Sequence, residues 1–199
     1  MNTQPSRLTA SLALAALAVI GLTGCEDTLD DFFGDDQSDR AVVEVSPTSA
    51  AGSEVNGAVY LYNTEGGVRV SGTLYGLTPG EHGFHIHTIP QCGDADIDGD
   101  GVAEPAGAAG PHWDPLSTNN HASPADPFDT RHAGDLGNIT ASSEGVAVFS
   151  LPIPGPAVGG EYDVLHHALM VHSNEDDLTS DPDGNAGTRV GCGVIRKDS

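Results

Sequence analysis

Short runs of apolar residues, separated by turn-forming residues, constrain the fold of this 199-residue chain more than any other feature. Valine, tyrosine, leucine and isoleucine dominate the runs, and glycine, proline, asparagine and aspartate separate them. The sequence shows no sustained helical period. The runs lie at residues 42–45, 55–62, 68–77, 83–87, 145–151, 164–172 and 189–195. They predict about seven or eight short strands in an all-β antiparallel sandwich or flattened barrel, with a hairpin connection at residues 63–67.

The stretch from Ile89 to His132 breaks this pattern. It is rich in glycine, proline, aspartate and alanine, and it contains no strand-like run. A loop of this length inside a compact domain is uncommon and often functional. We therefore expect this stretch to contribute to a functional site.

The charge of the chain argues against one class of partner. The formal net charge is -22, from 29 acidic and 7 basic residues. Binding to phosphate groups needs clustered Lys and Arg, so a nucleic-acid partner is not expected and an anionic membrane surface is disfavoured. Strong acidity is equally typical of a soluble protein in a salty medium. The length and the 38% of hydrophobic residues suffice for one domain with one core.

The first 24 residues have the pattern of an export signal. Arg7 and the amino terminus precede an apolar run at residues 8–22, which is too short to span a membrane. The following Leu-Thr-Gly-Cys sequence ending at Cys25 resembles the lipobox of bacterial lipoproteins, whose cysteine is acylated and becomes the first mature residue. Ordinary secretion with a free Cys25 thiol is the alternative. The acidic residues 25–40 predict a flexible tether, and residues 41–199 the folded domain.

A lipidated Cys25 would place the protein in the cell envelope, anchored to a bacterial membrane on its periplasmic or outer-membrane face. That lipid is the only membrane attachment that we expect. Because exported proteins meet oxidising surroundings, the two remaining cysteines, Cys92 and Cys192, are expected to form a disulfide that ties down the long loop. Two separate buried thiols are the alternative.

Six histidines and one aspartate supply ligands for two metal ions. His85 and His87 lie at positions i and i+2 of a strand-like run, so both imidazoles face the same side and form half of a copper site. Further along, three side chains offer the nitrogen and oxygen donors that suit tetrahedral zinc, and His112 can supply the fourth ligand. These three are His121, His132 and Asp135.

Seven short motifs occur in an order that resembles copper/zinc superoxide dismutases. They are Gly-Phe-His-Ile-His at 83–87, Cys92, Gly-Pro-His-Trp-Asp-Pro at 110–115, Arg-His-Ala-Gly-Asp-Leu-Gly-Asn at 131–138, Val-His at 171–172, Gly-Asn-Ala-Gly at 184–187 and Arg-Val-Gly-Cys-Gly-Val-Ile at 189–195. The resemblance spans about residues 41–196. It implies a Greek-key β-sandwich and an enzyme that converts superoxide to dioxygen and hydrogen peroxide.

The resemblance also implies the role of each site residue. Copper would be held by His85, His87, His112 and His172, and zinc by His112, His121, His132 and Asp135. A histidine shared by two cations must lose both ring protons, and His112 would then take up and return a proton during catalysis.

Two further residues take supporting roles by the same resemblance. Arg189 would attract and orient the superoxide anion near copper. Asp176 would hydrogen-bond to ligands of both metals, with the neighbouring Glu175 and Asp177 as alternative carboxylates. The remaining histidines, His82, His166 and His167, are expected to be structural or surface residues.

Two segments depart from the family pattern. Residues 173–183 contain no lysine, whereas many relatives carry lysine there, so we expect no strong steering of the anion. In the long loop, alternating carboxylates followed by glycine match the opening of a calcium-binding loop, but the bidentate glutamate is missing. An acidic solvated insertion is the alternative to a calcium site formed by Asp94, Asp96, Asp98 and Asp100.

Two other classes of function are compatible with parts of the sequence. A copper or zinc store would use the same ligands, but it would not need the anion-guiding Arg189. A lipid-tethered adhesion domain would not need an intact ligand set. The pattern of strands predicts no oligomeric state.

Overall fold

The computed structural model describes residues 40–198. The predicted export signal, Cys25 and the tether up to residue 39 lie outside the described residues, and those predictions stay untested. None of the helices in the described part is long and apolar enough to cross a membrane.

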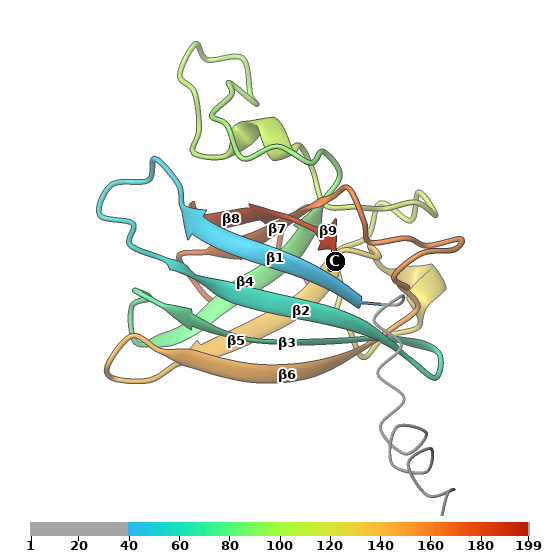
Figure 1. Cartoon of the computed structure of the whole chain (residues 1–199). Coiled ribbons are helices and arrows are strands. Elements are labelled where there is room, and N and C mark those ends of the chain that lie inside the picture. Colours follow the sequence, from blue (N-terminus) through green and yellow to red (C-terminus); the bar gives the residue numbers. More distant parts are fainter. Residues whose placement is uncertain (1–39, 199) are drawn as a thin grey trace, which may run out of the picture. The chain divides into compact units, whose positions relative to one another are not determined.

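Nine strands and two single-turn 3-10 helices make up residues 40–198 (Figure 1). The strands are β1 (Arg40–Pro47), β2 (Asn56–Thr64), β3 (Gly67–Tyr75), β4 (Gly80–His87), β5 (Asp135–Ala141), β6 (Ala147–Pro154), β7 (Ala168–His172), β8 (Arg189–Val194) and β9 (Arg196–Lys197). The two helical turns, η2 (Gly107–Ala109) and η3 (Phe128–Thr130), both lie in the long stretch between β4 and β5.

The strands pair antiparallel in the order β5-β4-β7-β8-β1-β2-β3-β6, with β9 beside β1. Consecutive strands β1, β2 and β3 are neighbours, whereas the pairs β3–β6 and β4–β7 join strands that are distant in the chain. In Figure 1, β1, β2, β3 and β6 form the near layer, and β4, β5 and β7 lie behind them. This Greek-key arrangement in a nearly closed barrel confirms the predicted fold class.

The hairpin between β2 and β3 is also confirmed. Thr64 pairs with Gly67, which leaves Glu65 and Gly66 as the two turn residues. Gly66 has a φ of 82°, a left-handed conformation that residues with a Cβ rarely adopt.

The sequence pattern did not predict β5 and β9. Along β5 the alternation is broken at Gly137, whose φ is 80°, and most of the strand is buried on both faces. The predicted run at 164–172 is too long by four residues because His166, with a φ of 63°, ends the extended conformation before β7 begins.

Strand β4 is buried on both faces, and this places the metal-ligand candidates. Phe84 and Ile86 belong to the main hydrophobic core, so the alternate residues His85 and His87 face the outside of the barrel. The outer face is nevertheless covered, because Ala106 and Ala109 of the long loop pack over it in a second, smaller apolar cluster. Both histidines are at most 1% exposed as a result.

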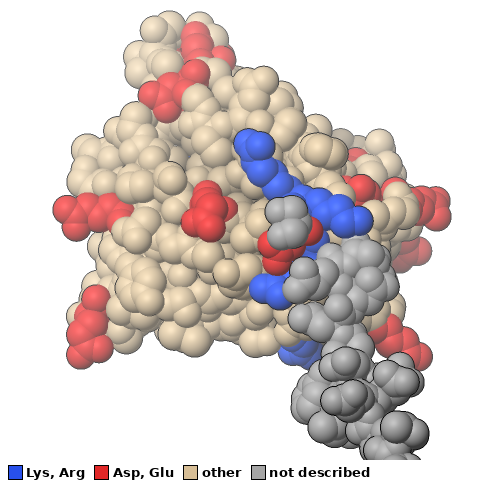
Figure 2. Space-filling model, in the orientation of Figure 1, with Lys and Arg blue, Asp and Glu red and all other residues tan. Residues whose placement is uncertain are grey.

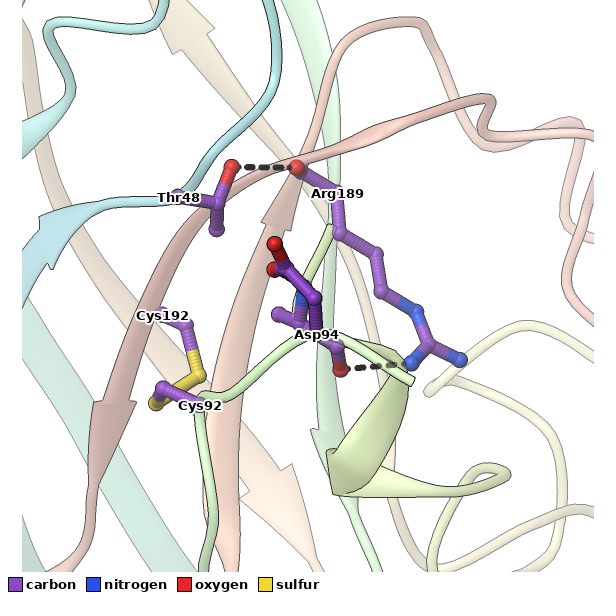
Figure 3. Close-up of a disulfide and its surroundings, with 6 residues drawn as sticks. Thr48, Cys92, Asp94, Arg189 and Cys192 are labelled. Atoms are coloured by element: carbon purple, nitrogen blue, oxygen red, sulfur yellow. Dashed lines mark hydrogen bonds between the residues drawn. A yellow bond between two sulfur atoms is a disulfide. The ribbon is translucent and has the colours of Figure 1, made fainter. Parts of the chain in front are cut away.

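A disulfide between Cys92 and Cys192 fixes this covering loop to β8, as predicted (Figure 3). The two cysteines are 100 residues apart in the chain. In the chain-entropy account, closing a loop of that size stabilises the folded state by about 4.7 kcal/mol. The disulfide therefore holds the loop against the barrel at one of its ends.

Candidate metal centre

Four histidines converge at the surface of the barrel beneath the long loop. His85 and His87 come from β4, His172 from the end of β7, and His112 from the loop. The backbone of His112 pairs with that of His87 in an isolated antiparallel β-bridge. One ring nitrogen from each histidine lies within 4.8 Å of the other three, and all four residues are buried.

The converging nitrogens have no hydrogen-bond partner in the protein. They are His85 Nδ1, His87 Nε2, His112 Nε2 and His172 Nε2, four of the five such buried side-chain atoms in residues 40–198. The opposite ring nitrogens of His87 and His172 donate to the carbonyl oxygens of Gly110 (2.8 Å) and Gly187 (3.0 Å). Those bonds place the proton on Nδ1 and leave a lone pair on Nε2. Because an unpaired buried polar atom is costly, the set fits a copper ion that accepts all four lone pairs.

Burial keeps these imidazoles neutral. It lowers the pKa of His85 and His87 well below the ordinary value, and it lowers the pKa of His172 to about 3. Burial also lowers the pKa of His112, although the hydrogen bond to Asp135 opposes this effect. Neutral imidazoles are the form that binds metal ions.

A second group of donors surrounds Asp135 at the start of β5. Its Oδ1 atom lies 2.8 Å from Nδ1 of His112, 3.0 Å from Nδ1 of His121 and 3.3 Å from Nδ1 of His132. A tetrahedral zinc ion with its ordinary bond lengths needs donors about 3.3 Å apart. Three nitrogens at 2.8 to 3.3 Å from one carboxylate oxygen, all within 4.8 Å of one another, form a donor set that fits zinc.

The buried carboxylate already carries its charge. Burial raises the pKa of Asp135, but the hydrogen bonds from His112, His121 and His132 outweigh burial and lower it below the ordinary value. An ionised carboxylate is the form that binds zinc.

The backbone holds the ligand segments together through three hydrogen bonds of 2.8 Å. The amide of Ile86 donates to the carbonyl of Gly134, Gly134 donates to Trp113, and Trp113 donates to Ile86. Each of these residues adjoins one or two of the candidate ligands. A Cβ on Gly134 would lie 2.2 Å from the carbonyl oxygen of Ile86, so only glycine permits this close contact.

Asp176 connects the two groups of ligands. Its carboxylate oxygens lie 2.8 Å from Nε2 of His85 and 2.8 Å from Nε2 of His121, and the residue is 1% exposed. Burial lowers the pKa of His121, but its hydrogen bonds to Asp135 and Asp176 outweigh burial and raise that pKa to about 10. The two carboxylates thus favour a cation at this position, which is a proton or a metal ion.

Gly184 leaves space for the side chain of Asp176, and Asn138 holds the backbone of Asp176 in place. A Cβ on Gly184, whose φ is 67°, would lie 1.9 Å from an oxygen of Asp176. Asn138 makes two hydrogen bonds of 2.8 Å to the backbone amide and carbonyl of Asp176. The role of Asn138 was not predicted, although the residue lies in one of the recognised motifs.

Arg131 is a second supporting residue whose role the sequence did not predict. It is fully buried and donates to the carbonyl oxygens of His132 (2.9 Å), Asp135 (3.3 Å) and Pro154 (2.8 Å). The guanidinium therefore holds the segment with two zinc-ligand candidates against the end of β6. Arg131 opens the motif at 131–138, but nothing in the sequence separates this buried role from a surface position.

Arg189 lies at the mouth of the histidine cluster. A pocket of about 400 Å³ is lined by Arg189 together with His87, His112 and His172. The guanidinium donates to the carbonyl oxygens of Ala106 (2.9 Å) and Gly110 (2.8 Å). Figure 3 shows Arg189 reaching toward the loop that carries Cys92 and Asp94. The loop that the disulfide ties down thus orients the cation beside the cluster.

The acidic insertion brings four carboxylates together, but not the four that the sequence suggested. The exposed Asp96, Asp98 and Asp100 gather with the half-buried Glu104, whereas Asp94 Oδ1 accepts from the amide of Ala106 instead. Exposed acidic residues commonly gather without an ion. Calcium binding stays a prediction of the sequence.

The three remaining histidines lie outside both ligand groups. His82 is buried and its Nδ1 donates to the carbonyl of His172 at 2.7 Å, which restrains the end of β7. His167 donates to the carbonyl of Thr88, and His166 is exposed. These positions agree with structural and surface roles.

Comparison with known proteins places this geometry in one family. The family model of copper/zinc superoxide dismutase matches residues 55–195. Copper/zinc superoxide dismutase 2 of Salmonella typhimurium is 35% identical over 184 residues, which cover 91% of this chain and 98% of that protein. A second such enzyme, from the plant Mesembryanthemum crystallinum, is 40% identical over 143 residues, covering 68% of this chain and 83% of that protein.

A solved structure agrees with the sequence comparisons. The copper/zinc superoxide dismutase from Brucella abortus superposes with a TM-score of 0.68 and 32% identity, covering 78% of this chain and 98% of that structure. The chain therefore belongs to the copper/zinc superoxide dismutase family.

Proposed function

We propose that this enzyme dismutes superoxide to dioxygen and hydrogen peroxide at a copper ion that shares one histidine with a zinc ion. The observation that carries this proposal is the position of His112, whose Nε2 points to the histidine cluster while its Nδ1 points to Asp135. The copper ligands are His85, His87, His112 and His172, and the zinc ligands are His112, His121, His132 and Asp135.

The two ions have different tasks. Bound copper supplies two accessible oxidation states for one-electron transfer, and zinc, which has no redox chemistry, orients and polarises the shared imidazole. His112 is the residue that handles a proton. Its Nε2 can take up one proton while the first superoxide is oxidised to dioxygen, and can give that proton to the second, which is reduced to hydrogen peroxide. Solvent supplies the other proton that the product needs.

Arg189 binds the substrate anion without taking part in electron transfer. Its guanidinium is held by two backbone carbonyls, so it is fixed in position before superoxide arrives. A metal store would need no such cation beside the cluster, which favours the enzyme over the store.

Substitution of single ligands tests the assignment of the two sites. His87→Asn should lose copper and retain zinc, His132→Asn should lose zinc and retain copper, and His112→Asn should weaken both, because only His112 belongs to both groups. Metal content by mass spectrometry and inhibition of superoxide-dependent dye reduction give the readouts. A His112→Asn protein with both metals at full occupancy and full activity would contradict the proposal.

Asp176 should strengthen the binding of both metals through the ligands that it orients. Asp176→Asn replaces one of two acceptor oxygens with a donor, so we expect about 10 to 100-fold weaker binding of copper and zinc in chelator competition. Asp177→Asn is the matched control. Asp177 is exposed and accepts from Thr179, Ser180 and Asn185 rather than from a candidate ligand. Equal affinities in the two variants would show that Asp176 has no such role.

The charges around the pocket oppose steering of the anion. Burial lowers the pKa of Arg189, whereas the nearby carboxylates of Asp183 and Glu104 raise it. These two negative groups offset part of the attraction that the guanidinium exerts on an anion. Four of the six Lys and Arg in residues 40–198 lie elsewhere, on strands β1, β3 and β9 of one continuous sheet region. Figure 2 shows cations gathered on that face. They are Arg40, Arg69, Arg196 and Lys197.

We therefore expect the dismutation rate to stay flat or to rise as salt is added, since screening weakens the repulsion of superoxide. Decay of superoxide followed by stopped flow at increasing ionic strength measures this. A steep fall of the rate with salt would instead show that attraction to the enzyme dominates.

We also propose that the enzyme is exported and anchored to a bacterial membrane through a lipid on Cys25, in the cell envelope. The export signal and lipobox pattern support this proposal. Cys25→Ala should move the active enzyme from the membrane fraction to the soluble fraction, and the mass of the wild-type mature amino terminus should correspond to an acylated Cys25. Wild-type enzyme that starts elsewhere, or that is soluble, would reject the anchor.

A further inference from the structure

Two pockets are lined by His112, and they differ in the charged residues that line them. The copper-side pocket described above contains Arg189. A second pocket of about 330 Å³ is lined by His112 and His132, and its charged residues are Asp114 and Asp181. No Lys or Arg of the described chain lines this second pocket.

We propose that the second pocket is the path by which zinc enters and leaves its site, and that Asp114 and Asp181 attract the cation there. This inference rests on the zinc ligands proposed above, and it adds a separate path for zinc beside the path of the substrate.

The exposure of the zinc ligands supports this path. The side chains of His121 and Asp135 are 0% exposed, and that of His112 is 3% exposed. The side chain of His132 is 9% exposed, and it faces the second pocket. An ion that leaves the four donors therefore reaches solvent most directly past His132.

The two carboxylates carry charges that no described cation neutralises. Asp114 accepts from the hydroxyl of Thr118 (3.2 Å) and the amide of Asn119 (2.9 Å), and Asp181 accepts from the amide of His121 (2.6 Å). Neither forms a salt bridge with a Lys or Arg in residues 40–198. Neutral donors thus hold both groups in place while their negative charge still acts on ions in the pocket.

The two pockets differ in their charged residues, so they attract different ions. A fixed guanidinium at the copper side attracts the superoxide anion, and two carboxylates at the zinc side attract a divalent cation and repel the anion. Because the pockets share only Pro111, His112 and Pro182 among their lining residues, the paths are distinct.

Zinc exchange in the full mature chain, with the disulfide intact, tests the proposal. Uptake is measured by mixing the metal-free protein with zinc in a stopped-flow instrument, and release by transfer of zinc from the loaded protein to a chromogenic chelator. Asp114→Asn and Asp181→Asn should each slow uptake and release about threefold at low salt, and the double variant about tenfold. The equilibrium affinity should stay within about twofold, and the rate differences should disappear at about 1 M salt.

Asp183→Asn is the matched control, because it removes the same charge from the copper-side pocket and should slow both zinc rates less than Asp114→Asn or Asp181→Asn does. Asp181 also bonds to the backbone of a zinc ligand, so a merely structural role would speed release and weaken affinity at every salt concentration. That result, or a double variant that takes up and releases zinc at wild-type rates, would contradict the proposed path of zinc. A wild-type protein that binds no zinc, or a His132→Asn variant that retains it, would refute the zinc assignment itself.

Discussion

One buried imidazole, His112, belongs to both groups of candidate metal ligands, and the rest of the structure holds it in that position. Its Nε2 has no partner in the protein and points to three other unpaired nitrogens, whereas its Nδ1 lies 2.8 Å from Asp135. A single ring can serve both groups only if its plane and its backbone are fixed. The hydrogen bond from Trp113, which follows His112, to Ile86, which lies between His85 and His87, supplies that constraint.

The fold contributes rigidity and burial rather than chemistry. Strand β4 gives one face to the barrel core and the other to the metal centre, so its register fixes the spacing of His85 and His87. The loop over them is held by the disulfide at Cys92, and by Arg189 through Ala106 and Gly110. Loss of the metals would leave four buried nitrogens unpaired, which couples metal binding to the stability of the fold.

The sequence was sufficient to predict the barrel, the disulfide and the residues that the structure brings together, because strand alternation and ligand motifs are local patterns. It was not sufficient for β5, where Gly137 interrupts the alternation. Arg131 and Asn138 were missed because their roles depend on backbone groups that only the folded chain brings within reach. The acidic loop gathers Glu104 rather than Asp94, since the Asp94 carboxylate accepts a hydrogen bond from the amide of Ala106.

The proposed dismutation requires His112 to be a ligand of both ions. The most direct measurement is the electron paramagnetic resonance spectrum of copper(II) after cobalt(II) has replaced zinc in the second site. A shared imidazolate couples the two paramagnetic ions, so the account predicts that the ordinary copper signal disappears. A full, unperturbed copper signal from protein that holds one cobalt per chain would contradict it.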